Sequence, residues 1–126
     1  MKKIYWVSRH APLVSQLREL KRIFNEDVEL IVDPEPFSSA KEIAERYKSS
    51  GCSDLVVVAP LSVIMRLVEE EGLHPLWAEM VEVADEKEAE VTVKGKHYRF
   101  AGFKRVKGVK LELEDVSLKK ELEPRF

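Results

Sequence analysis

The most constraining feature of this sequence is the run DLVVVA at residues 54–59, which is apolar at every position after Asp54. A strand with one face in water alternates apolar and polar residues, and this run does not. Continuous apolar character is typical of a strand that lies inside a parallel sheet with helices on both faces. Pro60 ends the run, because proline has no backbone N–H for a sheet. The run therefore predicts an α/β fold.

The rest of residues 1–83 repeats a unit of strand and helix. Short runs rich in strand-forming residues predict strands at 3–8, 28–32, 54–59 and 76–83. Apolar residues at helical spacing lie between them, as in Leu13, Leu17, Leu20 and Phe24. This alternation predicts a Rossmann-like parallel β-α-β-α-β-α-β layer.

Local signals place the ends of the second predicted helix. Ser39 and Glu42 have the spacing of a capping box, in which each side chain binds the backbone of the other residue. Gly51 is the residue type that most often ends a helix. Upstream, two prolines in the sequence Asp33-Pro34-Glu35-Pro36 prevent any strand from continuing into this region.

The pattern changes after Val83, and residues 84–116 predict antiparallel hairpins added to the parallel layer. Lys94-Gly95 suits a two-residue turn that would pair Val93 with Lys96. Ala101-Gly102 predicts a bulge. Lys107-Gly108 predicts a second turn, before a strand that alternates over 109–113. We expect Val91, Val93, Tyr98 and Phe100 to share one face of the hairpin.

Composition narrows the class of protein. The 126 residues are the length of one domain, and we expect a single domain ending in a charged, weakly structured tail at 117–126. The net charge of -2 and the lack of a long apolar segment predict a protein with no membrane span and no signal peptide, located in the cytoplasm. A single cysteine, Cys52, rules out an internal disulfide. A charged fraction of 35% with one Gln and one Asn is typical of heat-loving sources.

Ligands in open α/β sheets bind beyond the carboxyl ends of the strands. This rule selects the loops that contain Ser8-Arg9-His10, Asp33, Ser62 and Glu79. Arg9 can bind a phosphate through two hydrogen bonds, and His10 can act as an acid or base near neutral pH, with Ser8 beside it. We therefore predict His10 and Ser8 as catalytic residues, and Arg9, Ser62, Asp33 and Glu79 as ligand-binding residues.

A purely structural interpretation of these residues stays open. Ser8 and Arg9 can cap the following helix and pair with an acid, and Asp33 is a common turn residue before proline. Neither GxGxxG nor GxxxxGK[ST] is present, so no dinucleotide or P-loop cofactor is predicted. The three histidines have no ligand spacing, and no metal site is predicted.

The segment 94–110 predicts a second kind of site. It holds seven basic residues and no acidic one, and His97, Tyr98, Phe100 and Phe103 lie between them. Basic residues with aromatic ones suit single-stranded nucleic acid, and the contact residues would be Lys96, Arg99, Lys104 and Arg105. The alternative is that the aromatic residues belong to the core and that the lysines protect an edge strand.

Two stretches resemble a known family. IYWVSRHAPLVSQL and DLVVVAPLSVIMRLVEEEGLHPLWAEM look like small CRISPR-associated proteins with a Rossmann-like fold related to the CARF domain. Ser8, Arg9 and His10 match the Thr/Ser-Arg-His motif that ends the first strand in that group. Pro60, Leu61 and Ser62 match the turn that follows a later apolar strand. The similarity covers about two-thirds of the chain and omits the hairpins at 89–116.

The resemblance implies a homodimer that binds a cyclic oligoadenylate in its cleft, with or without metal-independent cleavage. Arg9 would hold a phosphate, and His10 or Ser8 would position the reacting 2′-hydroxyl or the leaving oxygen. The leading hypothesis is thus a nucleotide-binding domain that binds a cyclic oligoadenylate or, as a ring nuclease, cleaves it. The alternatives are a non-enzymatic module that binds single-stranded nucleic acid through segment 94–110, and an adaptor that docks a partner chain.

Overall fold

The computed structural model describes residues 1–116, and the predicted tail at 117–126 lies outside the described residues. The described chain is an α/β fold with one six-stranded sheet and three α-helices. None of its helices has the length and apolarity that a membrane crossing requires. The elements in chain order are β1 (Lys2–Val7), α1 (Val14–Phe24), β2 (Val28–Asp33), α2 (Ala40–Ser50), β3 (Asp54–Val57), α3 (Leu61–Glu69), β4 (Leu76–Val83), the 3₁₀ turn η1 (Glu86–Glu88), β5 (Val91–Val93) and β6 (Lys96–Arg105).

The sheet is mixed. Its strand order is β2-β1-β3-β4-β6-β5. β1 pairs in parallel with β2 and β3, and β3 pairs in parallel with β4. β6 runs antiparallel to both β4 and β5. The pairing therefore changes from parallel to antiparallel at β4 itself, which the sequence pattern had placed in the parallel layer.

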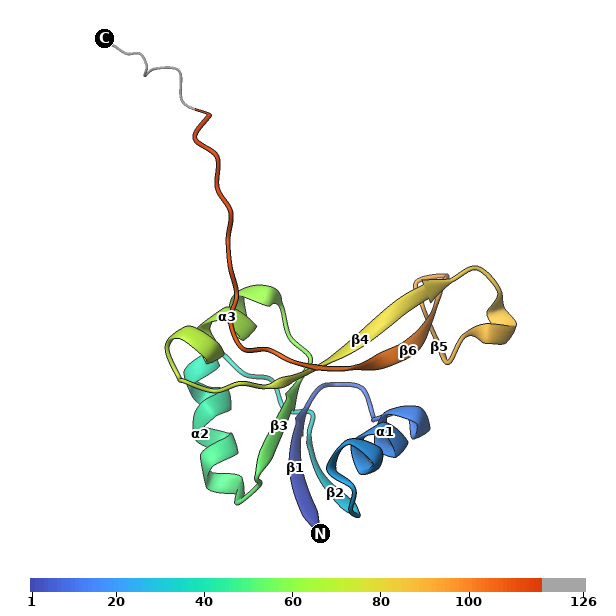
Figure 1. Cartoon of the computed structure of the whole chain (residues 1–126), viewed down its shortest axis with the longest axis horizontal. Coiled ribbons are helices and arrows are strands. Elements are labelled where there is room, and N and C mark those ends of the chain that lie inside the picture. Colours follow the sequence, from blue (N-terminus) through green and yellow to red (C-terminus); the bar gives the residue numbers. More distant parts are fainter. Residues whose placement is uncertain (117–126) are drawn as a thin grey trace.

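β1 lies at the centre of the fold because its alternate side chains enter two different cores. Tyr5 and Val7 pack with α2 and α3 on one face of the sheet. Ile4 and Trp6 pack on the other face with Leu20 of α1. Figure 1 shows this arrangement, with α2 and α3 on one side of β1 and α1 on the other.

The prediction that β3 is buried on both faces is confirmed for its four residues, which are all buried. The strand ends at Val57, two residues before the predicted end. Val58 still donates its N–H to the Val7 carbonyl at 2.9 Å, but it borders a cavity and is 46% exposed. This early end separates Pro60, the N-cap of α3, from the strand by two extended residues.

The second helix begins and ends where the sequence predicts, with one difference at its cap. The Ser39 hydroxyl accepts the Glu42 N–H at 3.2 Å, which is half of a capping box. The Glu42 carboxylate instead accepts the N–H and O–H of Ser38, at 2.9 and 2.8 Å. Gly51 ends the helix with a φ of 75°, a left-handed conformation that glycine adopts without a steric penalty.

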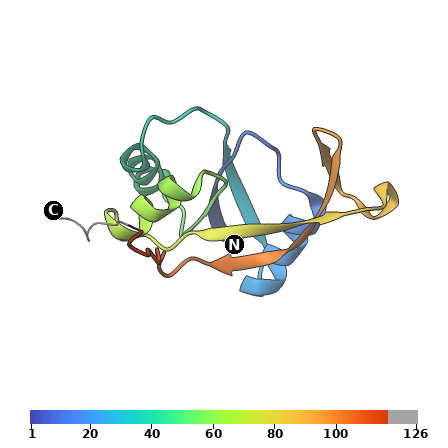
Figure 2. The ribbon, with the colours of Figure 1, turned by 90° about the horizontal axis from the view of Figure 1, so that it is seen from above.

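The hairpin leaves the parallel strands almost at once. β4 pairs with β3 at one position, Val56 with Leu76, and then pairs with β6 along its whole length. The resulting ribbon stretches beyond β1 and β3 in Figure 2. The predicted turn and bulge are confirmed: Val93 pairs with Lys96, and Ala101 is unpaired between Phe100 and Gly102.

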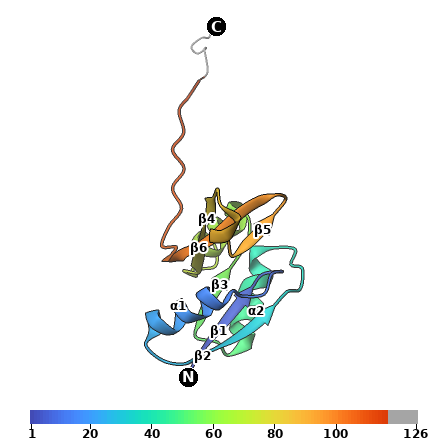
Figure 3. The same ribbon diagram turned by 90° about the vertical axis from the view of Figure 1, so that its right-hand side faces the viewer.

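The predicted strand at 109–113 is wrong, because residues 106–116 form no strand. β5 pairs only with residues 96–98 of β6, so within residues 1–116 the outer edge of β6 beyond Tyr98 has no strand beside it, and the chain does not turn back to cover that edge. The chain makes one more sheet-like bond, from the Val106 N–H to the Pro75 carbonyl at 2.9 Å, and then leads away from the domain (Figure 3). Leu111 and Leu113 are consequently 63% and 85% exposed.

An ion pair fastens the far end of the hairpin to the parallel strands. Both terminal nitrogens of Arg105 donate to the Asp54 carboxylate, at 2.7 and 2.8 Å. One of them also donates to the His74 carbonyl at 2.9 Å. Asp54 is 8% exposed, so the Arg105 guanidinium takes the place of most of the water that would otherwise surround its carboxylate.

We expect Arg105→Met to lower the free energy of unfolding by about 2–4 kcal/mol, because it leaves a buried carboxylate unpaired. Urea unfolding followed by circular dichroism measures this change. The matched control is Arg99→Met on the same strand, since Arg99 is exposed and has no ion pair within residues 1–116. Equal unfolding midpoints for the two variants would contradict the structural role given to Arg105.

Candidate ligand-binding site

A polar cavity of about 340 Å³ lies at the carboxyl ends of β1, β2 and β3. The chain passes from β1 outward to β2 and from β3 outward to β4 in the opposite direction. The cavity thus lies where the strand order reverses, the position at which open α/β sheets bind ligands. Its lining residues are Val7, Ser8, Arg9, His10, Asp33, Pro34, Glu35, Pro36, Phe37, Val58 and Pro60.

The loop after β1 is held by three hydrogen bonds. The Ser8 N–H donates to the Asp33 carbonyl at 3.3 Å, and the His10 N–H donates to the Ser8 hydroxyl oxygen at 3.0 Å. The indole N–H of the buried Trp6 donates to the His10 carbonyl at 3.3 Å. These bonds hold the loop in place, and the side chains of Arg9 and His10 line the cavity.

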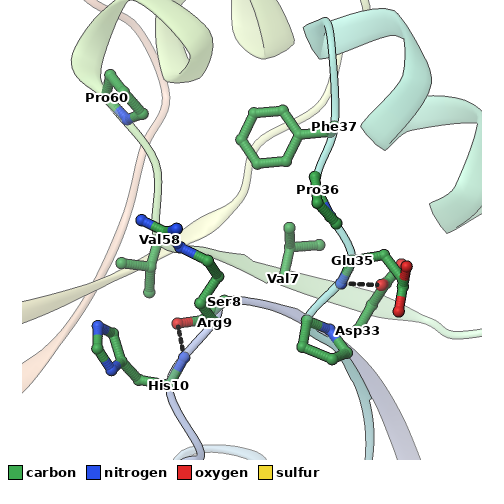
Figure 4. Close-up of a pocket in the computed structure, with 11 residues that line it drawn as sticks. Val7, Ser8, Arg9, His10, Asp33, Glu35, Pro36, Phe37, Val58 and Pro60 are labelled. Carbon is green, nitrogen blue, oxygen red and sulfur yellow. Dashed lines mark hydrogen bonds between the residues drawn. The ribbon is translucent and has the colours of Figure 1, made fainter.

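Arg9 is the cation of this cavity. Its side chain is exposed, and within residues 1–116 it has no ion pair or hydrogen bond. Figure 4 shows it rising from the loop toward Val58 and Pro60, with the His10 ring on the same side. α3 begins directly after Pro60, so the positive end of its dipole lies at the rim of the cavity. This side of the cavity suits an anion.

Asp33 is already engaged by the protein. Its carboxylate accepts the Tyr5 hydroxyl and the Glu35 N–H, the latter at 2.9 Å, and forms an ion pair with Arg46 at 3.5 Å. Burial alone would raise the pKa of Asp33, but these hydrogen bonds and the Arg46 charge together lower it. Burial and the bond to Asp33 raise the pKa of Tyr5, which therefore stays protonated as a donor. In Figure 4 the carboxylates of Asp33 and Glu35 point away from Arg9.

Arg46 shapes the opposite wall, and sequence reasoning missed it. Its guanidinium donates to the carbonyls of Glu35 and Pro36, at 3.4 and 2.7 Å, and to the carboxylates of Asp33 and Glu42. One side chain of α2 thereby holds the loop after β2 in place. The spacing of Glu42 and Arg46 predicts a helical ion pair, but the contacts with the loop depend on where α2 crosses β1.

A second, larger cavity adjoins the first. It is a groove of about 510 Å³ between the hairpin and the start of α1, with walls that are mostly apolar. The residues common to both cavities are Ser8, His10 and Val58. Gln16, for which the sequence pattern predicts no functional role, lines the groove and is 6% exposed. Gln16 is the third residue of α1, and this position predicts only that its side chain caps the start of the helix.

The structure separates two predicted ligand residues from this site. Ser62 is exposed on the first turn of α3 and lines neither cavity. Glu79 lies in the middle of β4, which runs on to Val83, and not at the carboxyl end of a strand. Its carboxylate forms an ion pair with Lys104 at 3.1 Å. Of the predicted site residues, the cavity brings together Ser8, Arg9, His10 and Asp33.

The predicted nucleic-acid residues lie on two faces of the hairpin. Arg99 and Lys104 are opposite Val81 and Trp77, on the face turned away from α1. Lys96 is opposite Val93, a residue of the groove, and Arg105 is held by Asp54. Of the aromatic residues interleaved with them, Tyr98 lines the groove and Phe100 contacts Phe103 at 4.9 Å between ring centroids, whereas His97 forms an exposed hydrogen bond with Thr92. Nucleic-acid binding by this hairpin stays a prediction.

No group of three or more His, Cys, Asp and Glu side chains is placed to hold a metal ion anywhere in residues 1–116. Comparison of the chain with family models, with curated proteins and with solved structures gives no match.

The wall held by Arg46 predicts a pH dependence of stability. Hydrogen bonds from Ser38 and the contact with Arg46 lower the pKa of Glu42 to about 2. Because this folded value lies below the ordinary value of 4.5, the unfolded chain binds more protons between pH 4.5 and 2. The stability that Glu42 contributes is therefore present above pH 4.5 and is lost as the pH falls toward 2. We expect Glu42→Gln to lower the urea midpoint at pH 7 and to flatten its fall below pH 4.5.

The control is Glu45→Gln on the same helix, because Glu45 is exposed and has no ion pair or hydrogen bond in the described chain. Its urea midpoint should follow that of the parent at every pH. A Glu42→Gln profile as steep as the parent's would contradict the assignment.

Proposed function

We propose that this protein binds a nucleotide-type ligand, with a phosphate of the ligand placed against Arg9 in the polar cavity. The carrying observation is the unpaired guanidinium of Arg9 on a loop whose backbone is held by Trp6 and Ser8. Arg is well suited to a phosphate because its planar N–H groups match two phosphate oxygens. The parallel pairing of β2, β1 and β3, which reaches β4 at the single pair Val56–Leu76, supports a Rossmann-like interpretation of this part of the sheet.

The electrostatics of the cavity support an anionic ligand. The Asp33 charge is compensated by Arg46, and its carboxylate points away from Arg9. The rim also carries the N-terminal end of α3, whose first N–H groups have no partner within the helix. The Ser8 hydroxyl accepts the His10 N–H but has no acceptor for its own proton within residues 1–116, so it is available as a donor to a phosphate oxygen.

We further propose that the bound ligand is a ribonucleotide phosphodiester and that His10 is the general base. The His10 imidazole would take the proton of a 2′-hydroxyl, the 2′-oxygen would attack phosphorus, and the 5′-oxygen would leave with a proton from water. The products are a 2′,3′-cyclic phosphate and a 5′-hydroxyl. A cyclic oligoadenylate, the ligand that the family resemblance implies, meets these requirements and is the first substrate to test.

The binding step predicts a strong effect of Arg9→Gln. A hydrogen-bonded charge pair contributes about 1.5–3 kcal/mol, which corresponds to a loss of about ten- to hundredfold in affinity. Isothermal titration calorimetry with cyclic tetra- and hexaadenylate and with inorganic pyrophosphate measures this loss. Arg18→Gln on the exposed side of α1 is the control and should bind like the parent. If Arg9→Gln binds as tightly as Arg18→Gln, the phosphate assignment is wrong.

The chemical step predicts that His10→Ala loses cleavage and keeps binding. A positioned general base contributes about 10²–10⁴-fold to a rate, so cleavage of the cyclic oligoadenylate should fall by at least 100-fold. Product analysis by mass spectrometry in the presence of EDTA measures it, and the affinity for the intact ring serves as the control. A variant that cleaves at the parental rate would exclude His10 as the base. If the parent protein binds the ring but does not cleave it, the proposed cleavage is rejected and the proposed ligand binding remains.

A further inference from the structure

The groove beside the polar cavity has the form of a subsite for a ring. One wall comes from the hairpin, through Met80, Val91 and Tyr98, and the other from Trp6 and the start of α1. Its volume of about 510 Å³ is in the range of pockets that hold small organic ligands. Aromatic and aliphatic walls of this kind favour a flat, mostly apolar group.

One polar side chain is built into these walls. Gln16 is 6% exposed, and its carbonyl oxygen accepts the Leu13 N–H at 2.8 Å. Its amide nitrogen has a single partner in the described chain, the thioether sulfur of Met80 at 3.8 Å. A thioether is a weak acceptor, so this amide N–H₂ group lies in the groove without a good hydrogen-bond partner.

The orientation of the Gln16 amide follows from its neighbour. The Leu13 N–H at the start of α1 needs an acceptor, because the first N–H groups of a helix have none within the helix. Exchanging the oxygen and nitrogen of the amide would place two donors against each other. The carbonyl must therefore face Leu13, and the N–H₂ group must face Met80 and the groove.

We infer that the groove binds the heterocyclic base of the ligand and that Gln16 donates a hydrogen bond to a ring nitrogen or a carbonyl oxygen of that base. This inference rests on the proposed function, since it places base and phosphate of one nucleotide in adjoining cavities. Ser8, His10 and Val58 line both cavities, so the sugar of such a ligand would pass over them. Figure 4 shows these three side chains on the same side of the polar cavity.

Gln16 is then the residue that determines specificity. A base with an acceptor on the edge that faces Gln16 satisfies the buried amide. A ring with only C–H groups on that edge leaves the amide unpaired and binds more weakly. The apolar walls contribute affinity for any flat ring, while the single donor distinguishes one ring edge from another.

The test compares ligands with and without a base. Calorimetry on the full chain measures the affinity of the four common nucleoside 5′-monophosphates and of ribose 5-phosphate. At least one nucleotide should bind ten times more tightly than ribose 5-phosphate. Gln16→Glu keeps an acceptor for the Leu13 N–H and removes the donor, so it should abolish this gain, measured as the ratio of the nucleotide affinity to the affinity for ribose 5-phosphate. Val91→Trp, which fills the groove from the hairpin and leaves the α1 cap intact, should do the same.

The outcomes separate this inference from the proposed function. Equal binding of all nucleotides and ribose 5-phosphate, with dependence on Arg9, would overturn the base subsite and leave the phosphate site standing. Nucleotide binding that needs Gln16 but ignores Arg9→Gln would reject the phosphate site and support the subsite. If Gln16→Glu and Val91→Trp both still bind the nucleotide more tightly than ribose 5-phosphate, as the parent does, the inference is overturned. If no probe binds the parent, both proposals are overturned.

Discussion

The burial of Trp6 is the interaction on which the rest of this structure depends. The side chain is 2% exposed at the centre of the sheet, where it packs with α1. Its ring meets Phe103 of β6 edge-on, with centroids 6.4 Å apart, which fixes the hairpin against the parallel strands. Its indole N–H also holds the His10 carbonyl. One side chain therefore joins the core, the hairpin and the loop that carries Arg9.

This arrangement explains why two cavities of different character adjoin. The polar cavity arises because β1, β2 and β3 end together and leave loop side chains without cover. The apolar groove arises because β4 leaves β3 after one paired position, so the hairpin stands over α1 instead of closing against it. The two cavities require both the parallel strands with their helices and the hairpin, and the loop from Ser8 to His10 forms the boundary between the two cavities.

Sequence reasoning succeeded where a signal is local. The spacing of apolar residues predicts the strands, and glycine predicts the turn at Lys94-Gly95 and the bulge at Ala101. The rule that ligands bind at strand ends selects three residues that line the polar cavity, Arg9, His10 and Asp33. It failed where a residue depends on distant neighbours. Leu111 and Leu113 alternate like a strand, but after Val106 the chain leads away from the sheet and both side chains are exposed. Glu79 was assigned to a strand end, but β4 continues past it and pairs with β6.

What the sequence by itself determined is the set of elements and the loop that carries the polar side chains, because backbone conformation and burial follow from residues close together in the chain. Only the tertiary structure decided what those side chains face. Whether Arg9 is free and Asp33 is occupied depends on Arg46, which reaches the loop from another element. The donor of Gln16 meets Met80 because a hairpin 64 residues away folds over α1. Side-chain chemistry at a site depends on contacts between distant segments, and local patterns do not encode them.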